Sequence, residues 1–243
     1  MCELCDSTLT PLSRRRLMLG AASMLAASAL PPSPASAAEP ASDEPAPNAI
    51  DPEAALQRLM QGNERYAANA PEQKDYSAGR AARVSAQYPI AAILSCADSR
   101  VSPELLFDQG PGDLFVVRLA GNFIDDDGLA SLEYAVKFLG VPLLMVLGHS
   151  NCGAVAAAIK VVKDGAELPG HLPELIDSIK PAVIAARARH PGDLLAAAIE
   201  ENVKLNVKRM HADVPILSEA LAAKKVAAVG GIYDLATGKV SLI

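Results

Sequence analysis

The sequence predicts an α/β fold, with a mainly parallel central sheet flanked by helices. Four apolar runs have the length and the unbroken hydrophobicity of buried strands, and they cover residues 89–95, 114–119, 141–147 and 226–233. Segments with helical apolar spacing lie between these runs, which is the order of βαβ units. Residues with reactive side chains directly follow the first and the third run, at the carboxyl ends where open α/β sheets bind their ligands.

Residues 1–37 are predicted to be an export signal outside the folded domain. Paired arginines precede an apolar run over residues 17–30, and the small residues at 35–37 offer a cleavage site. The paired arginines resemble a twin-arginine signal; an ordinary secretory signal or a disordered tail is the alternative. The apolar run is too short to span a bilayer comfortably. We therefore expect signal-peptide removal and a periplasmic or secreted protein with no stable membrane anchor.

The rest of the chain is predicted to be a linker followed by one domain. Residues 38–50 are rich in alanine, proline and acidic residues, as linkers often are, and residues 51–243 suffice for a domain with its own core. The first helix has Asp51 as N-cap and Pro52 in its first turn. The other predicted elements are a loop with a short helix over 71–88, helices over 128–139, 154–163, 173–189 and 193–210, and a hairpin turn at Thr237-Gly238 into 239–243.

The composition argues against one class of partner. The chain has a formal net charge of −6 at pH 7, no tryptophan and no stripe of basic residues. Because nucleic-acid binding depends on lysine and arginine neutralising phosphate groups, we predict no nucleic-acid partner.

Two motifs bring soft donor atoms to the predicted sheet edge. Cys96-Ala-Asp98-Ser-Arg100 follows the first strand, and His149-Ser-Asn-Cys152 follows the third. Two thiolates and one imidazole suit Zn²⁺ and leave a fourth tetrahedral position open for chemistry. Cys152 also begins a helix, whose N-terminal dipole favours the thiolate over the thiol.

A disulfide is the alternative for the same two cysteines. Cys2 and Cys5 precede the signal core and would be removed with it, which leaves Cys96 and Cys152 in the mature protein. Such a pair in an oxidising compartment can form a disulfide. A zinc ion that occupies both thiolates accounts for the pair as well, and export after folding would allow zinc to be loaded in the reducing cytoplasm.

Asp98 has two competing roles in the predicted site. Its carboxylate is close enough to Cys96 to complete a tetrahedral zinc shell, which would close the site. Arg100 can instead hold the carboxylate in a bidentate pair, which leaves the fourth position to water. Asp98 is therefore a candidate metal ligand and, together with Arg100, a candidate catalytic residue.

These motifs resemble those of the β-class carbonic anhydrases. Segments 115–122, 133–136 and 148–153 extend the similarity, which runs from about Pro52 to Asp234. The resemblance implies one Zn²⁺ per subunit, with Cys96, His149 and Cys152 as its ligands and Asp98 and Arg100 as a catalytic dyad.

The resemblance also implies a substrate pocket. Gln87 stands where the family has a glutamine that hydrogen-bonds substrate, and Phe115 where an aromatic residue lines the pocket. Tyr134 stands where plant-like members have a tyrosine that reaches across the dimer interface, and Gly153, which directly follows the second motif, is assigned to the same pocket. Ordinary packing is the alternative for the first three. Ile93 replaces the tryptophan that one branch of the family uses in an inhibitory bicarbonate pocket.

The activity that the resemblance implies is the reversible hydration of carbon dioxide to bicarbonate and a proton by a zinc-bound hydroxide. Two thiolates cancel the formal charge of Zn²⁺, so we expect activity to rise toward alkaline pH. Hydrolysis of carbonyl sulfide or carbon disulfide on the same fold is one alternative, and a non-catalytic zinc-binding domain is another. The family also implies a homodimer or a homotetramer, between which the sequence does not choose.

Overall fold

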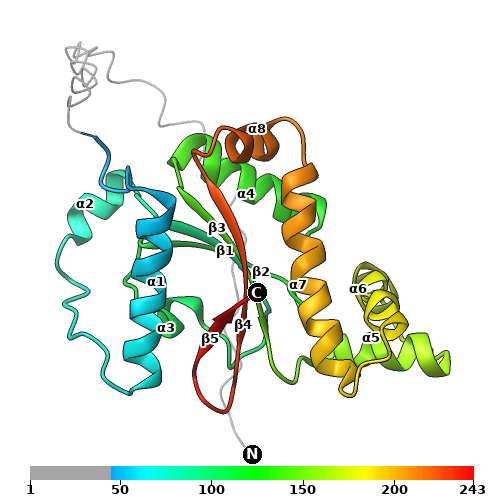
Figure 1. The fold of residues 1–243 in the computed structure, drawn as a ribbon. Helices are drawn as coiled ribbons and strands as arrows, with labels where there is room; N and C mark the ends of the chain where they lie inside the picture. The colour runs from blue at the N-terminus through cyan, green and yellow to red at the C-terminus, as the bar shows by residue number, and fades with distance from the viewer. Residues whose placement is uncertain (1–44) are drawn as a thin grey trace, which may run out of the picture. The chain divides into compact units, whose positions relative to one another are not determined.

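The computed structural model describes residues 45–243, whose fold is shown in Figure 1. The export signal predicted for residues 1–37 lies outside the described residues, as does most of the linker predicted for residues 38–50. The helices are α1 (Pro52–Ala67), α2 (Arg80–Ser85), α3 (Pro103–Leu106), α4 (Asp126–Leu139), α5 (Gly153–Asp164), α6 (Leu172–Ala188), α7 (Leu194–Ala212) and α8 (Ile216–Ala222). The strands are β1 (Ala91–Ser95), β2 (Leu114–Arg118), β3 (Leu143–His149), β4 (Ala227–Tyr233) and β5 (Val240–Leu242).

The strands form one sheet in the order β2-β1-β3-β4-β5. β1 pairs in parallel with both β2 and β3, and β3 pairs in parallel with β4. β5 is antiparallel to β4 and follows the hairpin turn that the sequence predicts. The predicted α/β fold with a mainly parallel sheet is confirmed. Because β1 and β3 are neighbours, their carboxyl ends lie side by side.

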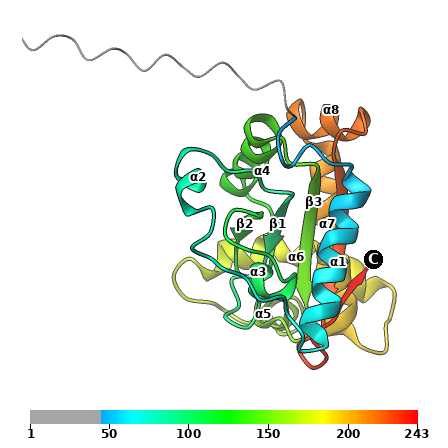
Figure 2. The same ribbon diagram turned by 90° about the vertical axis from the view of Figure 1, so that its left-hand side faces the viewer.

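Helices cover both faces of this sheet. α1 and α3 pack on one face, and α4, α7 and α8 pack on the other; the two views in Figures 1 and 2 show α1 and α7 on opposite sides of the strands. Every residue of β3 is buried, which explains why residues 143–147 form an unbroken apolar run instead of an alternating one.

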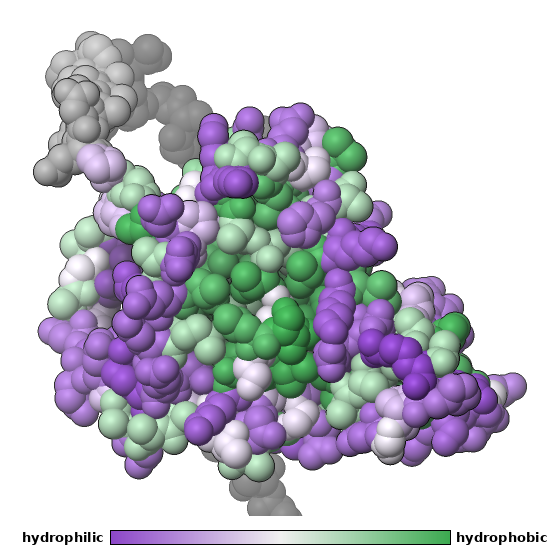
Figure 3. Space-filling view, in the orientation of Figure 1, coloured by the Kyte–Doolittle hydropathy of each residue, from purple (hydrophilic) through white to green (hydrophobic). Residues whose placement is uncertain are grey.

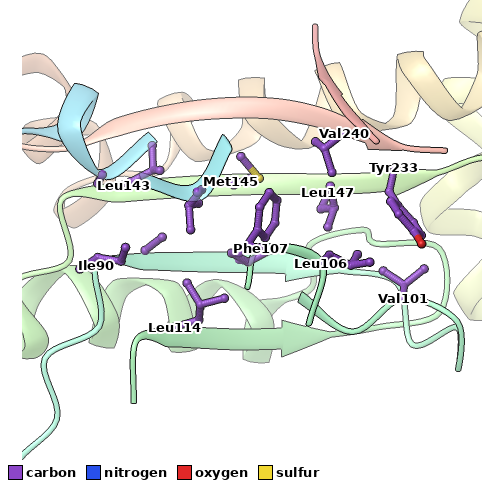
Figure 4. Packing of buried hydrophobic residues seen from close by; sticks show 14 residues of the cluster. Ile90, Val101, Leu106, Phe107, Leu114, Leu143, Met145, Leu147, Tyr233 and Val240 are labelled. Atoms are coloured by element: carbon purple, nitrogen blue, oxygen red, sulfur yellow. The ribbon is translucent and has the colours of Figure 1, made fainter. Parts of the chain in front are cut away.

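The core on the α1 side is built from aliphatic residues of β3 and one phenylalanine. Leu143, Met145 and Leu147 belong to the same buried cluster as Phe107, which follows α3 (Figure 4). A side chain of this size contributes about 1.5–3 kcal/mol to stability when it is fully buried. This packing fixes β3, and with it the strand end that carries His149.

Some elements differ from the sequence prediction. The short helices α3 and α8 were not predicted, because four and seven residues are too few to show helical periodicity. α4 begins at Asp126, before the predicted start, because the Asp125 carboxylate accepts a hydrogen bond from the Gly128 N–H and caps the helix. β3 begins after Pro142, which has no N–H for a ladder hydrogen bond, and it ends at His149 instead of before it.

One face of the molecule carries a largely hydrophobic area between α1 and α7 (Figure 3). A hollow of 440 Å³ lies there, and its apolar lining includes Val207, Val229, Leu242 and Ile243 beside two lysines of α7. Among the described residues, no helix combines the length and the hydrophobicity that crossing a membrane requires.

Candidate metal centre

Three side chains from three segments meet at the carboxyl edge of the sheet. Cys96 directly follows β1, His149 is the last residue of β3, and Cys152 is the N-cap of α5. All three residues are buried, and their ligand atoms lie within 4.8 Å of one another. The adjacent parallel strands β1 and β3 thus bring together the two motifs that the sequence analysis singled out.

One ring nitrogen of His149 is held by the backbone, and the other faces the cluster. Nδ1 lies 2.9 Å from the carbonyl oxygen of Ser150, so we assign the proton to Nδ1 and the lone pair to Nε2. Nε2 is buried and has no hydrogen-bond partner. A buried polar atom without a partner costs about 1–3 kcal/mol, and a metal ion on Nε2 would remove this cost. Such a backbone bond to the second nitrogen is what orients metal-binding histidines in general.

The two thiols are free, with no disulfide between them. The Gly121 N–H donates to Sγ of Cys96 over 3.2 Å, whereas the side chain of Cys152 makes no capping hydrogen bond to the first turn of α5. A hydrogen bond from the Cys152 thiol lowers the pKa of Cys96 to about 4, although burial opposes this shift. The same bond, together with burial, raises the pKa of Cys152. A metal ion that binds both sulfurs takes them as thiolates, so its binding releases the protons that the thiols carry.

Arg100 holds the carboxylate of Asp98 beside this cluster. Nε and the backbone N–H of Arg100 each donate to Oδ1 over 2.9 Å, and Nη2 donates to Oδ2 over 2.7 Å. These hydrogen bonds keep the pKa of Asp98 well below its usual range, so the carboxylate is ionised. Its Oδ2 lies 3.8 Å from Nε2 of His149, yet Asp98 is outside the group of three ligand residues. In this arrangement Asp98 is the partner of Arg100 and faces the metal position.

Arg118 supports the first motif, a role that the motif itself does not suggest. It ends β2, where it lies opposite Ser95 of β1. Its Nε donates to the carbonyl oxygen of Cys96 over 3.1 Å and its Nη2 to that of Asp98 over 2.6 Å. Arg118 therefore fixes the backbone of the first motif from the neighbouring strand. A charged residue at the end of a buried apolar run is the signal that could have revealed it.

The predicted substrate residues are not all at the metal centre of their own chain. Gln87 precedes the amino end of β1, whereas Cys96 follows its carboxyl end. Phe115 lies opposite Ala92, which is four residues before Cys96 and thus about 13 Å away along the strand. The rings of Phe115 and Tyr134 lie 6.3 Å apart between centroids. Phe115 and Tyr134 are therefore close to each other but lie away from the cysteines of the same chain.

Gly153, the fourth predicted substrate residue, is the first residue of α5, next to Cys152. It is exposed, and a Cβ atom added there would meet no atom within 4 Å. The space beside this position is therefore open, directly next to a metal-ligand candidate.

The donor set and its surroundings fit a zinc ion. Two thiolates and one imidazole are ligands that Zn²⁺ accepts in tetrahedral sites, and three protein ligands leave one position for a small molecule. The unpartnered Nε2 of His149 and the Gly121 N–H that donates to Cys96 are what a built metal site requires.

Known proteins that are similar to this chain in sequence are carbonic anhydrases. The family model of the carbonic anhydrases matches residues 91–240. Carbonic anhydrase 2 of Mycobacterium tuberculosis is 40% identical over 196 residues, which cover 79% of this chain and 93% of that relative. The carbonic anhydrase of Mycolicibacterium smegmatis is 39% identical over 194 residues, again with 79% of this chain and 93% of the relative covered.

Solved structures show the same similarity in three dimensions. The β-carbonic anhydrase CcaA superposes with a TM-score of 0.59 at 27% identity, over 77% of this chain and 94% of that chain. A Coccomyxa β-carbonic anhydrase, solved in complex with acetazolamide, gives a TM-score of 0.58 at 29% identity, over 77% of this chain and 86% of its own.

Proposed function

This chain belongs to the β-class carbonic anhydrase family, and from that premise we propose that it hydrates carbon dioxide reversibly, to bicarbonate and a proton, at one Zn²⁺ held by Cys96, His149 and Cys152. The observation that carries this proposal is the Asp98–Arg100 pair, whose carboxylate faces the metal position without being one of the three clustered ligands. A site that is open at one corner and has an ionised acceptor beside it is equipped for chemistry on a water molecule.

The zinc ion, when bound, supplies the Lewis acidity that lowers the pKa of water toward neutrality. The ionised carboxylate of Asp98 accepts a hydrogen bond from the attacking water and orients its lone pair toward the carbon of CO₂. Arg100 keeps Asp98 in place, because its three hydrogen bonds occupy Oδ1 twice and Oδ2 once. Since two thiolates reduce the charge of the metal, we expect activity to increase toward alkaline pH.

The same geometry disfavours a non-catalytic zinc domain. Such a domain would need Asp98 as a permanent fourth ligand, and that carboxylate would have to leave Arg100. The exposed guanidinium of Arg100 has no other hydrogen-bond partner among the described residues, so its place in the fold is explained by Asp98 alone. In a catalytic site, by contrast, Arg100 holds Asp98 where its carboxylate can accept a hydrogen bond from the attacking water.

We propose that the substrate pocket is completed by a second copy of the chain. Phe115 of β2 and Tyr134 and Phe138 of α4 form an aromatic group. The ring centroid of Tyr134 lies 6.3 Å from that of Phe115 and 5.2 Å from that of Phe138. Tyr134 is 47% exposed and Phe138 is 73% exposed, so these rings are free to pack against another subunit. A homodimer or homotetramer that uses this surface could carry Gln87, Phe115 and Tyr134 to the metal centre of a neighbour.

The test is stopped-flow CO₂ hydration together with zinc content, on the wild type, Cys96→Ser and Asp98→Asn. The wild type is expected to bind one zinc ion per chain and to be active, Cys96→Ser to lose zinc and activity, and Asp98→Asn to keep zinc while its activity drops. A wild type that binds zinc but hydrates no CO₂ would refute the proposal. Carbonyl sulfide and carbon disulfide are assayed in parallel, and a large preference for either would assign the chain to that hydrolysis.

We also propose that the protein is exported to the periplasm or beyond. The support is the paired arginines, the apolar run and the small-residue cleavage site within residues 1–37. Replacement of Arg14 and Arg15 by lysine is expected to retain the protein in the cytoplasm with its full length. An unchanged distribution between cell fractions would argue against the twin-arginine route.

A further inference from the structure

Two buried asparagines of α7 hold the loop of residues 119–125, which joins β2 to α4 and passes beside the metal centre. Nδ2 of Asn202 donates to the carbonyl oxygen of Gly121 over 2.8 Å, and Oδ1 of Asn206 accepts from the Ile124 N–H over 2.8 Å. Nδ2 of Asn206 in turn donates to the backbone carbonyl of Asn202 over 2.7 Å. Asn202 is 2% exposed and Asn206 is 7% exposed. The loop is thus fixed by two amides that lie about eighty residues further along the chain.

Gly121 links these amides to a metal ligand. Its N–H donates to Sγ of Cys96, while its carbonyl oxygen is the acceptor for Asn202. Its φ of +90° lies in the region that favours glycine. A Cβ atom there would lie 2.5 Å from Cδ1 of Ile179 and 3.1 Å from Cβ of Ala154. The residue therefore has no side chain to anchor it, and its orientation depends on what holds its backbone.

We infer that Asn202, supported by Asn206, is a positioning residue for the metal centre: it aims the Gly121 N–H at the sulfur of Cys96. A hydrogen bond to a metal-bound thiolate draws electron density from the sulfur and weakens its donation to the metal. Asn202 acts only through Gly121 and touches neither metal nor substrate. The inference rests on the proposed zinc site and names the residues that tune one of its ligands.

The placement of asparagine at this point of α7 supports the inference. Asparagine has a low helix propensity, and a buried amide is costly unless it is hydrogen-bonded. The neighbouring buried positions Ala198, Ile199 and Val203 of α7 are apolar. A polar side chain among them is explained by the Gly121 carbonyl oxygen, which would otherwise be buried without this donor.

Cobalt(II) is the probe, because the energy of its thiolate-to-metal charge-transfer band reports how strongly the sulfur donates. Asn202→Leu removes the donor to Gly121, and the milder Asn202→Ser leaves only a shorter hydroxyl in place of the amide that spans the 2.8 Å bond. Both variants are expected to shift the band to lower energy, because a sulfur that has lost its hydrogen bond donates more strongly to the metal. A band at the wild-type position in either folded variant would overturn the inference.

Asn63 offers a matched control on the other side of the sheet. It is a buried asparagine of α1 that bonds the carbonyl oxygens of Leu106 and Gly238 and accepts from the Val240 N–H. Asn63→Leu is expected to lower the melting temperature without moving the cobalt band. If its band moves as far as that of Asn202→Leu, the effect is a general loosening of the fold and the inference is wrong.

A measurement on the wild type covers the case in which the variants do not fold. In protein loaded with ¹¹³Cd²⁺, a hydrogen bond from Gly121 to the bound sulfur is expected to give a scalar coupling between ¹¹³Cd and the Gly121 amide proton. Its absence, in protein that binds the metal, refutes the inference and leaves the proposed function standing. A wild type that binds neither cobalt nor cadmium would instead refute the proposed metal site.

Discussion

Asp98 Oδ2 lies 2.7 Å from Nη2 of Arg100 and 3.8 Å from Nε2 of His149. One carboxylate oxygen is thus within hydrogen-bond distance of the arginine and a short movement away from the metal position. The hydrogen bonds from Arg100 therefore determine whether the Asp98 carboxylate stays beside the arginine or moves onto the metal. This relationship makes the activity depend on Arg100 even though Arg100 is outside the ligand cluster.

Replacement of Arg100 by leucine is expected to lower kcat/KM for CO₂ hydration by about 100-fold or more, the range of a lost acid–base or positioning group. Without the guanidinium, Asp98 is free to take the fourth ligand position and close the site. Stopped-flow kinetics measure the loss, and elemental analysis is expected to show unchanged zinc.

Arg58→Leu is the control for this variant, since Arg58 makes a single ion pair with Asp113, of 3.6 Å, on the exposed surface. It is expected to keep wild-type activity. Arg100→Leu with more than half of the wild-type activity would show that Asp98 does not need its partner.

Metal removal is expected to make the centre sensitive to oxidation. Both thiols are free and their sulfur atoms lie within 4.8 Å of each other. When a chelator has removed the zinc, diamide should oxidise Cys96 and Cys152 to a disulfide, itself being reduced to the hydrazine. Mass spectrometry of the linked peptides detects the product. Activity should then return with zinc plus a phosphine reductant but not with zinc alone.

The zinc-loaded protein provides the comparison, because its sulfurs are occupied by the metal. It is expected to resist the same dose of diamide. Two free thiols in the treated metal-free protein would contradict the prediction.

A buried carboxylate outside the ligand cluster is expected to control stability at acid pH. Asp108 accepts hydrogen bonds from Nε of Arg65 over 2.6 Å, from Lys74, and from the Glu72 N–H over 3.1 Å. Burial acts to raise the pKa of Asp108, but the bonds from Lys74 and Arg65 outweigh it and the pKa is lowered. Asp108→Asn should therefore reduce the free energy of unfolding by about 1–3 kcal/mol at pH 7, because two cations lose their partner.

The sign of the pH dependence follows from the lowered pKa. The contribution of Asp108 is complete above the ordinary aspartate pKa of about 3.9 and is lost as the pH falls through the lower folded-state value. Urea unfolding at pH 7, 5 and 3 should show the wild type and Asp108→Asn converging at the lowest pH. Asp113→Asn, at a more exposed ion pair, should differ from the wild type by less than about 0.5 kcal/mol. A constant difference at all three pH values would mean that the carboxylate charge is not responsible.

The proposed assembly makes the surface of α4 essential. Phe138→Asp is expected to dissociate the oligomer, because a charge replaces a ring that is 73% exposed in the single chain and buried in the proposed interface. Light scattering after size-exclusion chromatography measures the mass, and activity should fall with it. Ile184→Asp, at an exposed position of α6, should leave both unchanged. An intact oligomer in Phe138→Asp would place the interface elsewhere, for instance at the hydrophobic area between α1 and α7.

The ligand cluster could be predicted from the sequence because its determinants are local. Cys96 and His149 come at the ends of two apolar runs, and the parallel pairing of β1 with β3 brings these two ends side by side. The same reasoning could not place Gln87, Phe115 and Tyr134, because their proposed contacts are with another copy. Nor could it find α3 and α8, which are too short to have a periodic pattern.

The supporting residues were missed for a different reason. Arg118 acts on the first motif across a strand pair, and Asn202 acts on it from a helix that is about a hundred residues away in sequence. In the sequence, Arg118 is a single charged residue at the end of an apolar run, and Asn202 is a single polar residue within the apolar pattern of a helix. Only the three-dimensional contact shows which backbone group it serves.

The glycine at position 121 limits how this centre can be reused. A designer who transplants the two short motifs onto another sheet would carry over the ligands but not the backbone donor. That donor needs a residue with positive φ, packed closely against α5 and α6, and an amide from α7. The portable unit is therefore four segments in a fixed mutual arrangement. In a library of variants, we expect position 121 to accept no residue but glycine in any metal-binding clone.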